Sequence, residues 1–424
     1  MQASTVSLTF VAALLASLAL KFWLATRQAH HVASHRDRVP AAFVGTVSAE
    51  SHRKAADYTL AKSRLGLMTM AFGAIVLIGW TLLGGLDALN TAVRGAVQPR
   101  FGDLAYQLAL LGAFIAVGAV LELPFDWVST FRIEQRFGFN RMTPAMFFGD
   151  LAKGTAVAVA VGLPLAALVL WIMGASGGLW WLWAWGAWVG FNLLLLVLYP
   201  TVIAPLFNSF KPLADETLAA RVQALMQRCG FAANGLFVMD GSRRSAHGNA
   251  YFTGLGAAKR VVFFDTLLDR LTPGEVEAVL AHELGHFKRR HVLQRMVAIF
   301  AASLAGLALL GWLAAQSGFY EGLGVTPNLT APNDALALIL FMLAMPLFSF
   351  FAVPLGALLS RRHEFEADAY ACVQADGRDL ASALLKLHQD NAATLTPDPW
   401  YARFYYSHPP AAERLAALPS PTAA

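Results

Sequence analysis

The sequence predicts an all-α integral membrane protein with seven transmembrane helices, joined to a smaller polar part that contains a short β-hairpin or sheet. Two observations predict this class. Of the 424 residues, 57% are hydrophobic and only 14% are charged, whereas soluble domains have about 25% charged residues. The apolar residues also gather in seven runs, each long enough to cross a lipid bilayer. The composition therefore excludes an ordinary soluble enzyme, a disordered chain and a nucleic-acid-binding protein.

The seven apolar runs can be placed along the chain by their length and lack of charge. They lie at residues 5–26, 65–86, 105–123, 155–173, 179–203, 292–315 and 335–359. The first run is unlike a signal peptide, because no basic residue precedes it and its charges, Lys21 and Arg27, come at its end. We therefore expect it to be retained as the first transmembrane helix.

The basic residues indicate how these helices are oriented. The loops after the first, third and fifth spans, together with the tail, contain 28 of the 32 Lys and Arg residues, and the loops on the other side contain 2. Because Lys and Arg favour cytoplasmic loops, we expect the N-terminus outside and the C-terminus in the cytoplasm. The excess of Arg over Lys, 24 to 8, is typical of GC-rich bacterial genomes and favours a bacterial inner membrane.

The spans divide the chain into four parts. Residues 1–203 contain the first five transmembrane helices with their cytoplasmic loops, and residues 204–291 form a cytoplasmic loop. Residues 292–359 contain the last two transmembrane helices, and residues 360–424 form a cytoplasmic tail. The two cysteines, Cys229 and Cys372, have no metal-binding or redox spacing, so we expect two reduced thiols.

The cytoplasmic loop ends in a helix with a clear start signal. Thr272 can cap it, Pro273 suits the first helical position, and Glu275 completes a capping box. This helix carries the motif HELGH at residues 282–286. His282 and His286, four residues apart, share one helical face and can bind one Zn²⁺, and Glu283 can hold the attacking water.

Two histidines leave one protein ligand to be found for a catalytic zinc site. The tail offers it in the segment 360–371, where Glu364 and Asp368 share a helical face. One carboxylate can bind the metal while the other orients a ligating histidine. The spacing alone does not decide among Glu364, Glu366 and His363.

Five motifs together resemble the type I CAAX prenyl endopeptidases, which are integral-membrane zinc metallopeptidases of the gluzincin kind. The motifs are HELGH at 282–286, RRHEFEADAYA at 361–371, GNAYFTG at 248–254, YSHPPAAERL at 406–415 and FGFNRMTP at 137–144. The resemblance implies one zinc ion per chain, bound by His282, His286 and Glu364, at a metallopeptidase core on the cytoplasmic side. It implies Glu283 as the catalytic base and Asp368 as the residue that orients a ligand; Glu366 is then not a ligand.

Residues around this core are candidates for substrate binding. The β-branched and aromatic run 260–264 predicts a short strand, and the segment 245–254 can pair with it. Metallopeptidases commonly hold a peptide as an added strand, and the resemblance implies that Asn249 and Ala250 do so; the alternative is a purely structural turn. It also implies that His408 and Arg414 stabilise the oxyanion, although a His-Pro sequence before a helix is more often a cap or loop.

The expected function is therefore zinc-dependent endoproteolysis at a membrane, on a peptide or prenylated peptide. The resemblance implies removal of the C-terminal tripeptide that follows a prenylated cysteine. One alternative is a quality-control protease with broad specificity for membrane proteins. Another is a non-catalytic membrane protein with a structural zinc, but such a site would be closed by a fourth protein ligand.

Overall fold

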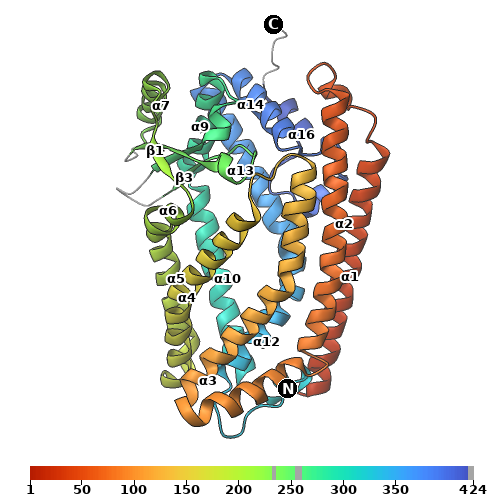
Figure 1. Ribbon diagram of the computed structural model, residues 1–424, viewed down its shortest axis with the longest axis vertical. Coiled ribbons are helices and arrows are strands. Elements are labelled where there is room, and N and C mark those ends of the chain that lie inside the picture. The colour runs from red at the N-terminus through yellow and green to blue at the C-terminus, as the bar shows by residue number, and fades with distance from the viewer. Residues whose placement is uncertain (232–234, 254–259, 419–424) are drawn as a thin grey trace.

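The computed structural model describes residues 1–231, 235–253 and 260–418 and confirms the seven membrane-spanning helices (Figure 1). Several of them are longer than the apolar runs that predicted them. They are α1 (Ala3–Ser34), α2 (Ala49–Trp80), α3 (Gly85–Val128, continued by the π-helical turn Ser129–Glu134), α4 (Pro144–Ala175), α5 (Trp180–Leu198, continued through Tyr199–Ile203 into α6, Ala204–Phe207), α10 (His291–Ala314) and α12 (Asp334–Ser349, continued through the 3₁₀ turn Phe350–Ala352 into α13, Val353–Gln374).

The second span ends earlier than its apolar run predicts. Helix α2 ends at Trp80, and the chain turns through Gly84, whose φ of 74° is in the left-handed region. Residues 87–104, expected as a loop, belong to α3, which is interrupted at Gly102 (φ 80°). The first part of α3 lies across the end of the helical body where the N-terminus is found (Figure 1). Hydropathy did not detect this turn, because apolar residues continue through it.

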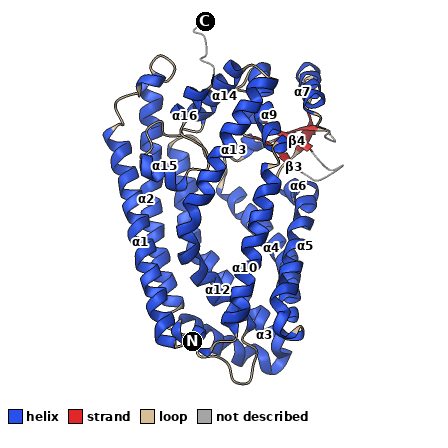
Figure 2. Ribbon diagram, turned by 180° about the vertical axis from the view of Figure 1, so that it is seen from behind, coloured by secondary structure: helices blue, strands red, loops and turns tan. Residues whose placement is uncertain are grey.

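The polar elements gather at the opposite end of the helical body, beyond α10 and α13 (Figures 1 and 2). Five helices of at least seven residues lie there: α7 (Glu216–Cys229), α9 (Pro273–Lys288), α14 (Gly377–Asp390), α15 (Pro399–Tyr405) and α16 (Ala411–Ala417). The short helix α8 (Asp265–Leu268) also packs there, against β4, whereas the short helix α11 (Ser317–Gly322) lies near the N-terminus.

A four-stranded sheet completes this polar layer. The sequence predicted a sheet here, but only the two strands around residues 245–254 and 260–264. The strand order is β1-β2-β4-β3, with β1 Phe210–Pro212, β2 Leu236–Met239, β3 Ala250–Thr253 and β4 Arg260–Phe264. Strand β4 has the predicted bounds. Strand β3 pairs antiparallel with β4, with Ala250 opposite Phe263. Among the described residues β3 pairs on one side only, so its other edge can accept a further strand.

The membrane part and the polar layer each have a large apolar core of their own. In the membrane part, large apolar side chains such as Leu8, Ile75 and Val120 are exposed, as expected for surfaces that contact lipid. In the polar layer, buried apolar residues of α7, β4, α9 and α14 pack against one another, including Val222, Phe263, Leu280, Leu284 and Ala381. Helix α9 is therefore surrounded by protein, which fixes the position of the side chains on its buried faces.

The predicted capping box of α9 is present. Glu275 N–H donates to Thr272 Oγ1 at 3.4 Å, and Thr272 N–H donates to Glu275 Oε2 at 2.8 Å. The Glu275 carboxylate also accepts from Ser382 Oγ at 2.6 Å and Lys386 Nζ at 2.7 Å, both on α14. The start of the helix is thus attached to the tail as well as capped.

Candidate metal centre and substrate cavity

Helices α9 and α13 bring the three expected metal ligands together. His282 Nε2 and His286 Nε2 lie 3.2 Å apart, Glu364 Oε1 lies 3.3 Å from His286 Nε2, and Glu364 Oε2 lies 3.4 Å from His282 Nε2. Two ligand atoms at zinc-binding distance from one tetrahedral centre lie about 3.3 Å apart. The three side chains therefore have the separation and the chemistry of a zinc site.

Glu364 gives a second indication that a cation fits here. Its carboxylate is 4% exposed, and Oε2 has no hydrogen-bond partner among the described residues. A buried carboxylate oxygen without a donor is costly unless a cation compensates it. The nitrogen atoms nearest to Oε2 are His282 Nε2, at 3.4 Å, and Arg414 Nη1, at 3.5 Å. A metal ion between Glu364 and the two imidazoles would satisfy this oxygen.

Asp368, one turn after Glu364 on α13, orients His282. His282 Nδ1 lies 2.8 Å from Asp368 Oδ1, and because a carboxylate only accepts, the ring proton lies on Nδ1. Nε2 is then free to face the metal. Burial lowers the pKa of His282, but its contacts with Asp368 and Glu364 outweigh burial and raise the pKa to about 9. Metal binding requires the neutral imidazole of His282, with Nε2 unprotonated.

His286 has a different supporting partner, which the sequence did not reveal. Its Nδ1 lies 3.0 Å from Nδ1 of His291, and His291 Nε2 lies 3.1 Å from Glu366 Oε2. His291 is 4% exposed, and His363 stacks on it with ring centroids 3.9 Å apart. Glu366 and His363, which the spacing left open as ligands, therefore lie behind His286 and not beside His282. The available signal in the sequence was a further histidine, His291, five residues after His286.

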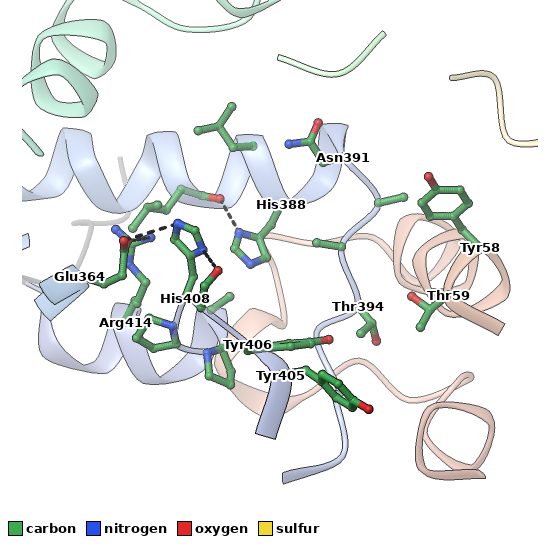
Figure 3. Close-up of a pocket in the computed structure, with 18 of the residues that line it drawn as sticks. Tyr58, Thr59, Glu364, His388, Asn391, Thr394, Tyr405, Tyr406, His408 and Arg414 are labelled. Carbon is green, nitrogen blue, oxygen red and sulfur yellow. Dashed lines mark hydrogen bonds and ion pairs between the residues drawn. The ribbon is translucent and has the colours of Figure 1, made fainter. Parts of the chain in front are cut away.

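Glu283 lines a cavity of about 890 Å³, together with His282 and Glu364 of the ligand set; Figure 3 shows Glu364 at this cavity. The cavity is lined by residues of α1, α2, α9, α13, α14, α15 and α16 and of the segment before α16, among them His282, Glu283, Glu364, His408 and Arg414. Burial raises the pKa of Glu283 above that of an ordinary glutamate. A carboxylate with a raised pKa is better suited to take and return a proton near neutral pH.

His408 and Arg414 both reach Glu364 but differ in surroundings. His408 Nε2 lies 3.4 Å from Glu364 Oε1, its side chain is 65% exposed, and its Nδ1 lies 2.9 Å from Ser407 Oγ (Figure 3). Although the side chain faces the open cavity, the surrounding protein reduces its contact with bulk water, and this desolvation lowers the pKa of His408. Arg414 is buried, and its Nε donates to Asp368 Oδ2 at 2.8 Å while Nη2 donates to Oδ1. Arg414 therefore holds Asp368, whereas His408 borders the open cavity.

The two expected substrate residues lie at the same cavity. Asn249 is exposed and Ala250 is buried, and both line the cavity at the start of β3. The Phe264 N–H donates to the Asn249 carbonyl at 3.0 Å, and the Ala250 N–H donates to Asn249 Oδ1 at 2.8 Å. Every site residue expected from the sequence thus lies at the metal site or borders the cavity.

Comparison with known proteins agrees with this arrangement. The family model described as "CAAX prenyl protease N-terminal, five membrane helices" matches residues 28–209, and "Peptidase family M48" matches residues 212–422. The "CAAX prenyl protease 1 homolog" of Arabidopsis thaliana is 35% identical, with 90% of each chain covered. "CAAX prenyl protease 1" of Saccharomyces cerevisiae is 32% identical, with 90% of this chain and 88% of that protein covered.

A solved structure extends the similarity to the whole fold. The crystal structure of S. mikatae Ste24p superimposes with a TM-score of 0.91 and 29% sequence identity, over 98% of this chain and 99% of that one. The two family models together account for both the membrane helices and the polar layer. The chain therefore belongs to peptidase family M48 and is an integral-membrane metalloendopeptidase.

Proposed function

We propose that this enzyme is a zinc-dependent endopeptidase that removes the C-terminal tripeptide of prenylated peptides. The observation that carries the proposal is the convergence of His282, His286 and Glu364, with atoms spaced for one zinc ion, beside Glu283 in a large cavity. The relatives named above carry CAAX prenyl protease in their names, which supports a prenylated C-terminal peptide as the substrate.

The side chains at the site have different roles in peptide hydrolysis. Zinc, when bound, would polarise the scissile carbonyl and lower the pKa of the attacking water. Glu283 takes a proton from that water and later gives it to the leaving amine. His408, at the open side of Glu364, donates a hydrogen bond to the developing oxyanion. Arg414 supports the same reaction through Asp368, and its Nη1, 3.5 Å from Glu364, adds positive charge beside the reacting carbonyl.

The substrate backbone is held on the open edge of β3. The main-chain groups of successive residues in a strand point to opposite edges. Because the Asn249 carbonyl accepts from Phe264 on the β4 side, the main-chain groups of Ala250 and Phe252 point to the open edge. The Asn249 side chain, which accepts from the Ala250 N–H, lies on that edge too. A peptide added there forms main-chain hydrogen bonds that place one carbonyl at the metal.

The same proposal places the active site on the cytoplasmic side of its membrane. The support is the position of 28 of the 32 Lys and Arg residues on the side of the polar layer. The excess of Arg over Lys supports the inner membrane of a bacterium, whereas the relatives named above come from eukaryotes. A cysteine-accessibility experiment on intact cells, with single cysteines near Met1 and in the tail, tests the orientation.

Peptide hydrolysis by the purified enzyme tests the function. We expect release of a tripeptide from a farnesylated peptide, loss of activity with 1,10-phenanthroline and recovery with added zinc. An unfolded protein substrate serves as the comparison, because a quality-control protease would cleave it faster than the farnesylated peptide. Stoichiometric zinc without hydrolysis of either substrate would contradict the proposal and favour a non-catalytic role.

A further inference from the structure

The substrate cavity extends from the metal site to the membrane helix α2. Figure 3 shows Tyr58 and Thr59 of α2 on the side of the cavity opposite Glu364 and Arg414, and Lys62, one turn further, also lines the cavity. Among the described residues that line it, Lys62 and Arg414 are the Lys and Arg side chains. The far wall of the cavity therefore carries a positive charge at some distance from the zinc ligands.

These two cations differ in how fully their charge is already compensated. Arg414 has a 7% exposed side chain and contacts both Asp368 and Glu364. Lys62 has a 54% exposed side chain; its Nζ donates to Tyr58 Oη at 3.3 Å and lies 3.8 Å from Glu134 Oε1. An ammonium group has three donors, so Lys62 keeps donor capacity towards the cavity.

Among the described residues, Glu134 is the carboxylate that pairs with Lys62, and it also has other partners. Tyr58 Oη donates to its Oε1 at 2.5 Å, and His247 Nε2 lies 3.6 Å from its Oε2. His247 also stacks on Phe139 of the FGFNRMTP motif, with ring centroids 4.5 Å apart. Glu134 thus connects α2 to the segment before β3, and its ion pair with Lys62 is a long one, at 3.8 Å.

The direction of a peptide added to β3 brings its C-terminal end to this place. Antiparallel pairing is the more stable of the two directions per residue, and a strand antiparallel to β3 runs towards the residues that precede Ala250. Those residues are Gly248, which lines the cavity, and His247, which contacts Glu134. Three extended residues span roughly 10 Å. The leaving tripeptide therefore runs along the cavity towards α2.

We propose that Lys62 binds the free α-carboxylate at the C-terminus of the substrate. The proposal rests on the proposed function, because removal of a C-terminal tripeptide is what places a carboxylate on that side of the cleaved bond. The Lys62 ammonium would then select substrates that end three residues after the scissile bond. Its partial exposure limits the contribution to about a tenfold change in kcat/KM.

The test compares a farnesylated peptide that ends in a free carboxylate with the same peptide ending in a carboxamide. The enzymes are wild type, Lys62→Met, Lys62→Arg and the control Lys54→Met. Lys54 lies on the same helix, but its Nζ is 4.9 Å above the Phe139 ring and it does not line the cavity. Zinc content and thermal unfolding are measured for each variant, so that kinetics are compared between folded, metal-loaded enzymes.

We expect wild type to prefer the free acid about tenfold in kcat/KM, mainly through KM. Lys62→Met should lose this preference by becoming slower on the acid only, Lys62→Arg should keep it, and Lys54→Met should behave as wild type. Equal use of both peptides by wild type, or an equal loss on both peptides in Lys62→Met, overturns the role of Lys62. If wild type releases no tripeptide from either peptide, the proposed function itself fails, and the role of Lys62 with it.

Discussion

Gly285 of α9 lies directly against Ala367 of α13. A β-carbon placed on Gly285 would lie 3.0 Å from Ala367 Cα and 3.1 Å from its carbonyl oxygen. Gly285 lies between His282 and His286, and Ala367 lies between Glu364 and Asp368, so the two helices approach each other where the ligands project. The absence of a side chain at position 285 allows the three ligand atoms to meet around one ion.

Gly285→Ala should therefore weaken the metal site without touching a ligand. The new methyl meets backbone, which cannot turn aside as a side chain can, and overpacking of this kind costs about 1–3 kcal/mol. We expect lower zinc affinity in chelator competition and a lower melting temperature. Gly356→Ala, on α13 with no atom within 4 Å of the added carbon, is the control and should be neutral or stabilising. Equal behaviour of the two variants would contradict this account of Gly285.

Glu283→Gln should abolish hydrolysis while zinc stays bound. The amide cannot accept the proton of the attacking water, and removing a general base typically lowers the rate about 10²–10⁴-fold. The measurements are kcat on a peptide substrate and zinc content by atomic absorption. Glu413→Gln, an exposed residue of α16 next to Arg414, is a control and should keep wild-type kcat. A Glu283→Gln enzyme with wild-type kcat would show that another group is the base.

The sequence predicted the parts of this structure that depend on local pattern. Seven apolar runs identified the spans, and the Thr272–Glu275 capping box and strand Arg260–Phe264 have the predicted bounds. These features depend on composition or on residues close in the chain. The motif resemblance then supplied Glu364, which lies far from His282 in the sequence and which spacing alone left undecided.

Other features depend on tertiary contacts that no local pattern records. His291 meets Glu366 of α13, and Lys62 lines the same cavity as Glu283 although helices α3 to α8 lie between them in the chain. The turn at Gly84 interrupts an apolar run, and the early part of α3 is helical although its charges suggested a loop. Strands β1 and β2 were also missed, because each has at most four residues and is defined by its partners.

The contact between His291 and His286 predicts a residue that acts on metal affinity from outside the ligand set. With its Nδ1 protonated, His286 donates to His291 Nδ1 and presents Nε2 to the metal, and His291 Nε2–H donates to Glu366. His291→Leu should lower zinc affinity about 10- to 100-fold, the usual effect of losing such a partner.

Chelator competition measures this affinity, and the visible spectrum of the cobalt-substituted enzyme reports the orientation of His286. His291→Asn, which keeps an acceptor for His286, should recover part of the affinity and of the spectrum. His363→Leu removes the ring that stacks on His291. Because this ring acts on His286 only through His291, the variant should lose less zinc affinity than His291→Leu. If His291→Leu binds zinc as tightly as wild type, His286 does not depend on His291.

The ion pair between Asp398 and Arg27 predicts a pH-dependent contribution to stability. Arg27 Nη2 donates to Asp398 Oδ2 at 2.9 Å, which joins α15 to α1, and the N–H groups of Trp400 and Tyr401 donate to Oδ1 at 3.0 Å. Burial raises the pKa of Asp398, but Arg27 and the N–H donors outweigh burial and lower it. Because the folded pKa lies below the unfolded one, Asp398 stabilises the fold above about pH 3.9, and this contribution is lost as the pH falls through the folded pKa.

Asp398→Asn keeps an acceptor for the N–H groups of α15 but loses the charge, so it should destabilise the fold by about 1 kcal/mol at pH 7. Asp398→Ala also loses the helix cap and should cost about 1 kcal/mol more. Thermal unfolding in detergent from pH 7 to pH 3 measures both. The difference between wild type and Asp398→Asn should be constant down to about pH 4 and shrink below it. A difference that stays constant to pH 3 would mean that the charge of Asp398 does not stabilise the junction of α1 and α15.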